Sequence, residues 1–103
     1  MKQTPYPIDL SVMQTTLKEH RQSLGKQTGR FHYSNEVGLI NFGITGKHNG
    51  CVHELLITRK LVKAMRRVVC ENIKLIKLHI CYEDRKQACR KLFLQITTSK
   101  IKN

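Results

Sequence analysis

Acidic residues are scarce in this chain. Asp and Glu number 7 against 19 Lys and Arg, which gives a formal net charge of +12 and an isoelectric point near 10.0. A surface of this kind attracts polyanions. Nucleic acid is the commonest such partner, followed by acidic proteins and anionic membrane surfaces. Seven carboxylates in 103 residues also argue against a nuclease that holds two metal ions.

Long apolar runs are missing as well. None approaches the roughly 20 residues that span a membrane, and the N-terminal residues MKQTPYPIDLSVM lack the apolar centre of a secretory signal. We therefore expect a cytoplasmic protein, nuclear if the source is a eukaryote, with no membrane partner. A chain of 103 residues with 40% hydrophobic residues is predicted to fold as one domain over 1–103. Residues 1–8 would form an extended lead-in and 99–103 a frayed basic tail.

Paired cysteines of the CxxC type are absent, although the chain has four cysteines. Without a secretory signal, free thiols are favoured over disulfides. His48, Cys51 and His53 are three candidate zinc ligands, with a fourth available among Cys70, His79, Cys81 and Cys89. Their spacing matches no standard zinc knuckle. We therefore predict a turn at this segment, with no metal and no other cofactor.

Motifs of catalysis are also absent: the chain has no GxSxG, Walker loop or HExxH sequence. A small ribonuclease could draw a general base and a cation from side chains that the chain does contain. These candidates are His32, His48, His53, Glu54, Arg59 and Tyr82. Nothing in the sequence fixes their mutual geometry, so we assign no catalytic residue and favour a protein that is not an enzyme.

Two segments have the apolar spacing of a helix. In residues 10–24, apolar side chains recur every three or four positions, Ser11 and Gln14 resemble a capping box, and Gly25 can end the helix in the left-handed conformation. In residues 58–70, Thr58 is a candidate N-cap. The apolar stripe of this second helix consists of Leu61, Ala64, Met65 and Val68, with Val69 beside it.

The remaining segments are rich in β-branched and aromatic residues that alternate with other side chains. This period of two predicts strands at 30–34, 37–45, 51–58, 73–82 and 92–97, with a charged connection at 83–91. Asn49-Gly50 predicts a type I′ hairpin turn with its tip near residues 47–50. The predicted fold class is therefore α+β: an N-terminal helix and an antiparallel sheet of about four to five strands, with a second, basic helix packed on the sheet.

Basic residues are concentrated in the second half of the chain, where thirteen of the nineteen follow residue 57. With no Trp, three Tyr and three Phe, binding led by phosphate contacts is favoured over base stacking, and Tyr33 or Tyr82 would at most assist. The predicted nucleic-acid-binding residues are Arg59, Lys60, Lys63, Arg66, Arg67, Lys74, Lys77, Arg85, Lys86, Arg90 and Lys91.

These observations favour a small, basic nucleic-acid-binding protein with a regulatory role. One alternative is an adaptor or inhibitor, of the type that phages and mobile elements encode, whose basic face docks an acidic protein. A small toxin-like ribonuclease is the second alternative. The sequence does not decide between DNA and RNA, and it leaves a homodimer open.

Overall fold

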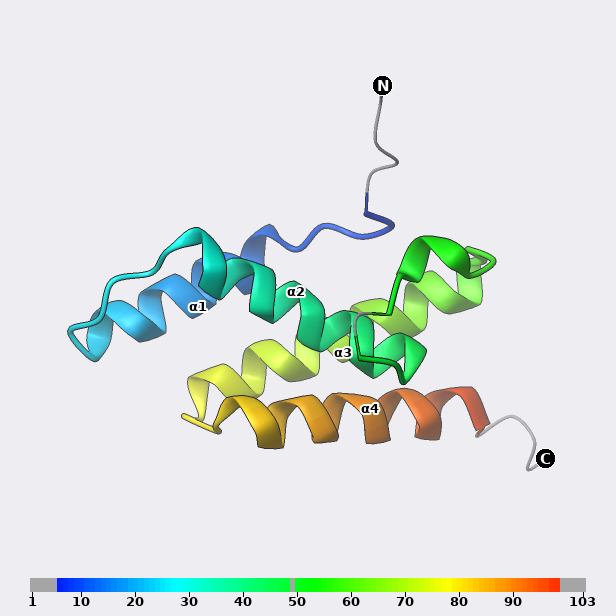
Figure 1. The fold of residues 1–103 in the computed structure, drawn as a ribbon. Coiled ribbons are helices and arrows are strands. Elements are labelled where there is room, and N and C mark those ends of the chain that lie inside the picture. The colour runs from blue at the N-terminus through cyan, green and yellow to red at the C-terminus, as the bar shows by residue number, and fades with distance from the viewer. Residues whose placement is uncertain (1–5, 49, 99–103) are drawn as a thin grey trace, which may run out of the picture.

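The fold consists of helices joined by short connections (Figure 1). A computed structural model describes residues 6–48 and 50–98. The elements are α1 (Ser11–Ser23), α2 (Arg30–Thr45), the short 3-10 helix η1 (Val52–Glu54), α3 (Arg59–Lys77) and α4 (Tyr82–Thr98). Within the described ranges there is no strand, so the predicted α+β fold with its sheet of four to five strands is wrong.

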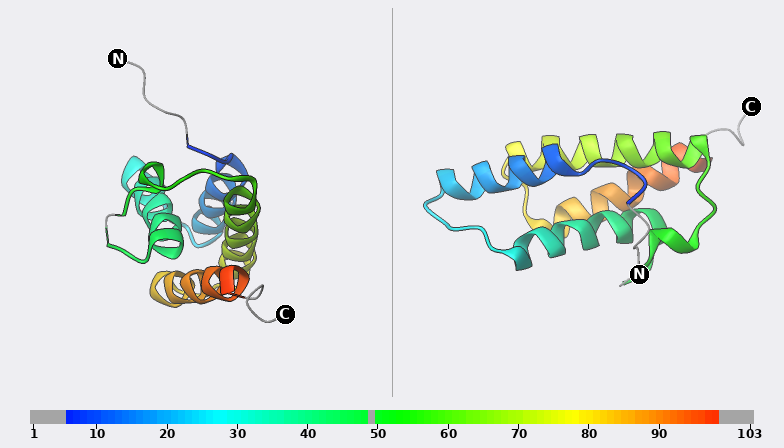
Figure 2. Two further views of the ribbon diagram at one scale, coloured as in Figure 1. Left: turned by 90° about the vertical axis from the view of Figure 1, so that its right-hand side faces the viewer. Right: turned by 90° about the horizontal axis from the view of Figure 1, so that it is seen from above.

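The four long helices pack around one shared core. α3 packs against both α1 and α4, and α2 packs mainly against α4. α1 and α2 have few contacts with each other. In the view from above, α1 and α3 run side by side along one edge of the molecule (Figure 2). This arrangement leaves one long side of α3 open to solvent and a groove between α1 and α2.

Apolar side chains from all four helices fill the core. Met13 of α1, Ile40 of α2, Met65 of α3 and Cys89 of α4 are each fully buried. Burying an apolar side chain as large as Met or Ile contributes on the order of 1.5–3 kcal/mol. Ile8, which precedes α1, is also buried and joins the N-terminal segment to this core.

The two helices expected from apolar spacing are confirmed. Gly25 has φ +74° and its N–H donates to the Gln22 carbonyl, so it ends α1 as predicted. Thr58 caps α3, because its Oγ1 accepts a hydrogen bond of 3.1 Å from the Leu61 N–H. The capping box at Ser11 is wrong: α1 has no side-chain cap, and Ser11 lies in its first turn.

The strands predicted at 30–34 and 37–45 are instead the single helix α2. Its buried residues are Glu36, Leu39, Ile40, Gly43 and Ile44, which recur at the spacing of three and four that defines one helix face. A carboxylate and a glycine occupy two of these buried positions. Because neither residue is apolar, the apolar residues of this segment alone do not show the period of a helix.

The strand predicted at 73–82 is wrong because α3 continues through Lys77. Ile73 and Ile76 are three positions apart on its inner side, as are Lys74 and Lys77 on its outer side. The chain then turns at His79, whose φ is +63°. This turn sends the chain back into α4.

α4 contains both the predicted connection at 83–91 and the strand predicted at 92–97. Phe93 is buried at 9% exposure whereas Leu94 is 43% exposed, so Leu92, Leu94 and Ile96 do not share an inner face as the strand required. Arg85, Cys89 and Phe93, each four positions apart, are the buried stripe of this helix.

The hairpin predicted near residues 47–50 is wrong as well. The residues on either side belong to α2 and η1 and not to strands, so there is no strand pair for a hairpin to join. Asn49 lies outside the described residues. Gly50 instead sits against Thr45, where an added Cβ would lie 2.8 Å from the Thr45 Cβ. The connection therefore needs a residue without a side chain at this point.

Candidate nucleic-acid interface

The outer side of α3 is a strongly cationic surface, with a gap between Arg67 and Lys74. Its members are separated by one, three, four or seven positions, which places them on one side of the helix, and all are exposed. From the first to the last the helix rises about 27 Å. We call this surface the cationic face, and it consists of Arg59, Lys60, Lys63, Arg66, Arg67, Lys74 and Lys77.

One carboxylate lies beside the cationic face. Glu71, the one acidic residue of α3, is half-buried and borders the same depression as Arg67 and Lys74. Among residues 6–48 and 50–98 the sole ion pair joins Glu36 to Arg85, far from the exposed side of α3. Uncompensated like charges along one helix produce a potential of several kT, which attracts a polyanion.

Arg85 is not part of that surface, contrary to the sequence prediction. It is 6% exposed and forms a buried ion pair with Glu36 of α2. Its guanidinium also donates to the Asn72 side-chain oxygen at 3.0 Å and to the Ile80 carbonyl at 3.1 Å. A charge engaged in this way holds helices together and is not available to a phosphate.

Lys86 and Arg90 are half-buried and contact α2. The Lys86 ammonium lies 4.8 Å from the centre of the Phe42 ring. Arg90 donates to the carbonyls of Gly43 and Ile44 at 3.3 Å each, at the C-terminal end of α2. Both were predicted as phosphate ligands, and the structure assigns them to helix packing.

Lys91 is the exposed cation of α4 within the predicted set. Its neighbour Leu92 borders a depression of about 360 Å³ between α3 and α4, together with Arg67 and Lys74. The predicted set thus divides in two. All seven cations on α3 are exposed on the cationic face, whereas three of the four on α4 point toward α2.

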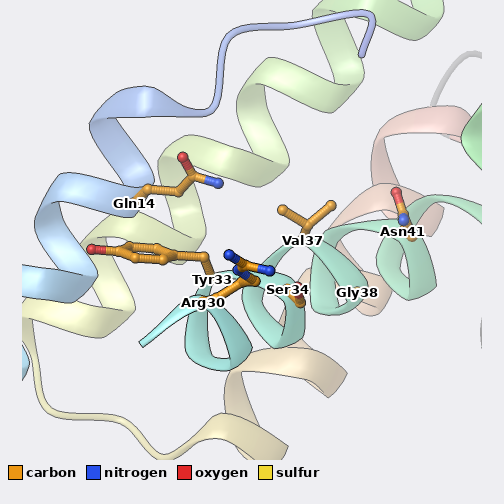
Figure 3. Close-up of a pocket in the computed structure, with 7 residues that line it drawn as sticks. All are labelled: Gln14, Arg30, Tyr33, Ser34, Val37, Gly38 and Asn41. Carbon is orange, nitrogen blue, oxygen red and sulfur yellow. The ribbon is translucent and has the colours of Figure 1, made fainter. Parts of the chain in front are cut away.

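A second surface, which the sequence did not indicate as a site, lies between α1 and α2 (Figure 3). Tyr33 projects from α2 toward α1 and borders two adjoining hollows of about 410 and 400 Å³. Gln14 of α1 stands across from it, and Arg30 lies beside it. We call the two hollows the Tyr33 groove. Gly38, which has open space around it, adds no side chain to the groove, and no local sequence pattern indicates this groove.

Tyr82, the other tyrosine considered for stacking, is engaged in the fold. Its hydroxyl donates to the Asn35 carbonyl at 3.1 Å, and the Arg85 guanidinium carbon lies 5.8 Å from the centre of its ring. Burial is the main cause that raises the pKa of this phenol, with the charge of Glu36 adding to it. Tyr82 is therefore a packing residue and not an open stacking surface.

Two histidines meet at one end of the bundle. His20 Nε2 of α1 and His79 Nδ1 of the α3–α4 turn are 2.8 Å apart and share a hydrogen bond. Partial burial lowers the pKa of His20, and the nearby charges of His79, Arg85, Lys26 and Arg21 lower it further. The pair is a contact between α1 and the turn that precedes α4.

The candidate metal ligands do not form a cluster. In the part of the chain that the structure describes, no three His, Cys, Asp or Glu side chains come together. Cys89 is buried, and burial raises the pKa of its thiol to about 12, which opposes ligation. His53 packs edge-on against the Tyr6 ring, with 6.1 Å between ring centres.

The candidate catalytic residues are spread over the molecule. His32 lies at the N-terminus of α2, where its Nδ1 accepts from the Gly29 N–H at 3.0 Å. His53 and Glu54 lie in η1, beyond the C-terminus of the same helix. Tyr82 begins α4. Residues at opposite ends of a helix cannot surround one scissile phosphate.

Comparisons with protein-family models, with curated proteins and with solved structures found no match. Among the described residues, no helix combines the length and the apolar character that crossing a bilayer demands. The cationic face and the Tyr33 groove are therefore interpreted from their own chemistry.

Proposed function

We propose that the protein binds nucleic acid through the cationic face of α3 and acts as a small regulatory protein. The observation that carries this proposal is a row of seven exposed cations along one side of a helix of five turns, five of them in its first half and two near its C-terminal end, none of them in an ion pair among the described residues. Nucleic-acid backbones carry phosphates at short, regular intervals, so a straight row of cations can neutralise several at once. Such a function would place the protein in the cytoplasm, or in the nucleus of a eukaryote.

The cations of this face are exposed, so we expect the stability of α3 to depend little on them, which makes the proposal testable. The opposite side of the helix is anchored by Ala64, Met65, Val68 and Val69, all buried in the core. Removing exposed side chains from a helix usually changes the free energy of unfolding by less than about 0.5 kcal/mol. Loss of binding in such a variant would therefore report on contact with the ligand.

The experiment compares two variants that lose the same charge. Lys63→Ala with Arg67→Ala removes two cations from the cationic face. Lys26→Ala with Lys47→Ala removes two exposed cations from connections elsewhere. We expect the first pair to weaken binding to a fluorescent RNA or DNA duplex by at least tenfold more than the second. Only the first pair removes side chains that contact phosphates, if the cationic face is the binding surface. Equal weakening by both pairs would contradict the proposal.

A second candidate function is supported by a different feature of the same region. A groove of about 490 Å³ lies between the start of α3 and the end of α4, with Leu61, Ala64 and Ile96 among its apolar lining residues. Lys60, Lys63 and Arg67 also border this groove. An acidic protein segment with apolar side chains would fit it. In that case the Lys63/Arg67 variant would lose a protein partner, and the parent would show little affinity for nucleic acid at physiological salt.

A further inference from the structure

We propose that the Tyr33 groove holds one unpaired base of a bound nucleic acid, so that the protein prefers single-stranded segments or loops over duplex. This inference rests on the proposed function and adds a ligand class to it. Protein contacts to unpaired bases combine aromatic stacking, hydrogen bonds to base edges and cations near the phosphate. Groups of all three kinds border the Tyr33 groove.

The groove is open because of the residues that line it. α1 and α2 have few contacts with each other, and Gly38 of α2 contributes no side chain. An added Cβ at Gly38 would find no atom within 4 Å. Tyr33 is half-buried and borders the hollow on each side of it, so its ring is held while part of it is left accessible. An aromatic ring fixed in an open groove is a platform for stacking.

Amide side chains supply the hydrogen bonds that a base edge requires. Asn41 accepts a hydrogen bond of 2.7 Å from the Tyr6 hydroxyl through its Oδ1, which orients the amide and leaves its NH₂ group to donate. Gln14 stands across the groove, near the Tyr33 ring (Figure 3). An amide can both donate and accept, as the edges of all four bases do.

The charge of the groove suits a phosphate. Arg30 borders one hollow and Lys18 the other, and neither hollow has a carboxylate among its lining residues. Lys18 lies on α1, which packs directly against α3. A helix is about 10–12 Å across, so a strand held on the cationic face needs to cross only α1 to bring a base to Tyr33.

Phe31 offers a control, because it is an aromatic residue of the same helix outside the groove. It is 72% exposed in the first turn of α2 and is not a lining residue of either hollow. If any accessible aromatic ring were sufficient, Phe31 would serve as well as Tyr33. The inference requires that Tyr33 matters and Phe31 does not.

The test measures the affinity for two labelled RNAs, a blunt duplex and a hairpin with the same stem closed by an unpaired uridine loop. We expect the parent to prefer the hairpin. Tyr33→Ala should abolish that preference, lowering hairpin affinity by roughly 5- to 150-fold, the range for loss of one stacked base. Tyr33→Phe and Phe31→Ala should keep it.

Gly38→Leu is a second variant in case Tyr33→Ala fails to fold. The new side chain enters open space, so the fold should persist while the groove is filled. It should lose the hairpin preference and keep duplex affinity. An unchanged ratio of hairpin to duplex affinity in folded Tyr33→Ala or Gly38→Leu would overturn the groove inference alone. Failure of the parent to bind either RNA, and a DNA duplex as well, would overturn the proposed function with it.

Discussion

Asn72 is the residue through which α3 is joined to the other three long helices inside the core. Its amide nitrogen donates to Glu36 Oε2 at 2.6 Å and to the sulfur of Met13 at 3.3 Å. Its oxygen accepts from Arg85, which is also ion-paired to Glu36. Each charge in this buried network therefore has partners. Removal of one charge from such a network costs more than the network itself contributes.

Arg85→Met should therefore be strongly destabilising. The substitution keeps the volume of the side chain but leaves the Glu36 carboxylate buried without its cation, at a cost of about 3–5 kcal/mol in the free energy of unfolding. Adding Glu36→Leu should recover much of that loss, because no unpaired charge remains. Urea denaturation of the parent, the single and the double variant measures both effects. A single variant within about 1 kcal/mol of the parent would contradict the description of this network.

The His20–His79 pair makes stability depend on pH. The pKa of His20 lies below its ordinary value in the folded protein, so the unfolded chain takes up a proton first as the pH falls. The contribution of the pair is complete above about pH 6.5 and declines as the pH falls from there toward the folded pKa. The parent should therefore lose stability between about pH 7.5 and about pH 5.5.

His20→Asn should reduce that pH dependence, because the titrating group is gone while an amide can still bond to His79. The measurement is the free energy of unfolding at the two pH values in parent and variant. Other histidines and carboxylates titrate in both proteins, so the difference between the two proteins isolates His20. An identical pH dependence in both would show that the His20 proton does not couple to folding.

At the scale of elements, apolar spacing predicts a helix only where the residues of the inner face are apolar. α3 was predicted from its first residue because Ala64, Met65 and Val68 are an unmixed apolar stripe. α2 was missed because Glu36 and Gly43 occupy inner positions. A polar residue in the core is indistinguishable in sequence from one on the surface, since its burial depends on a partner, here Arg85, 49 positions away.

The candidate site was predicted in part for the same reason. Every cation of α3 opposite its apolar stripe is exposed, as the spacing indicated. The sequence predicts a connection at residues 83–91 and therefore places the cations of this segment on the surface. As a helix, this segment turns Arg85, Lys86 and Arg90 toward α2. The Tyr33 groove depends on how α1 and α2 lie relative to each other, which no local pattern contains.

α2 and α4 are close at Gly43, and this contact should tolerate no large side chain. A Cβ at Gly43 would lie 3.3 Å from the Cys89 Cβ and 3.5 Å from its carbonyl carbon. Gly43→Leu should therefore force the helices apart, at a cost of about 1–3 kcal/mol or more, as overpacking does. Gly38→Leu, five positions earlier on the same helix and in open space, is the matched control.

Gly38→Leu should raise stability by up to about 1 kcal/mol, because leucine favours a helix more than glycine does. Thermal unfolding followed by circular dichroism compares the two variants with the parent. Equal melting temperatures for Gly43→Leu and Gly38→Leu would show that α2 and α4 are not in close contact at residue 43.

At the scale of the whole molecule, charge is distributed unevenly over the fold. Seven unpaired cations lie along α3, while the described part of the chain contains a single ion pair, which is buried. A large part of the positive charge is therefore concentrated on one exposed helix of a chain whose net charge is +12. A uniform solvated surface would not require that concentration, whereas a backbone-binding surface would.

The salt dependence of nucleic-acid affinity tests this account most directly. If about six phosphates are contacted, the plot of log affinity against log salt for a duplex should have a slope near −5, with roughly a thousandfold loss between about 50 and 200 mM salt. Lys63→Ala with Arg67→Ala should make the slope shallower by about two units, and Lys26→Ala with Lys47→Ala should leave it unchanged. A slope near zero for the parent, or the same slope for the parent and the Lys63/Arg67 variant, would contradict the assignment of the cationic face of α3 as the binding surface.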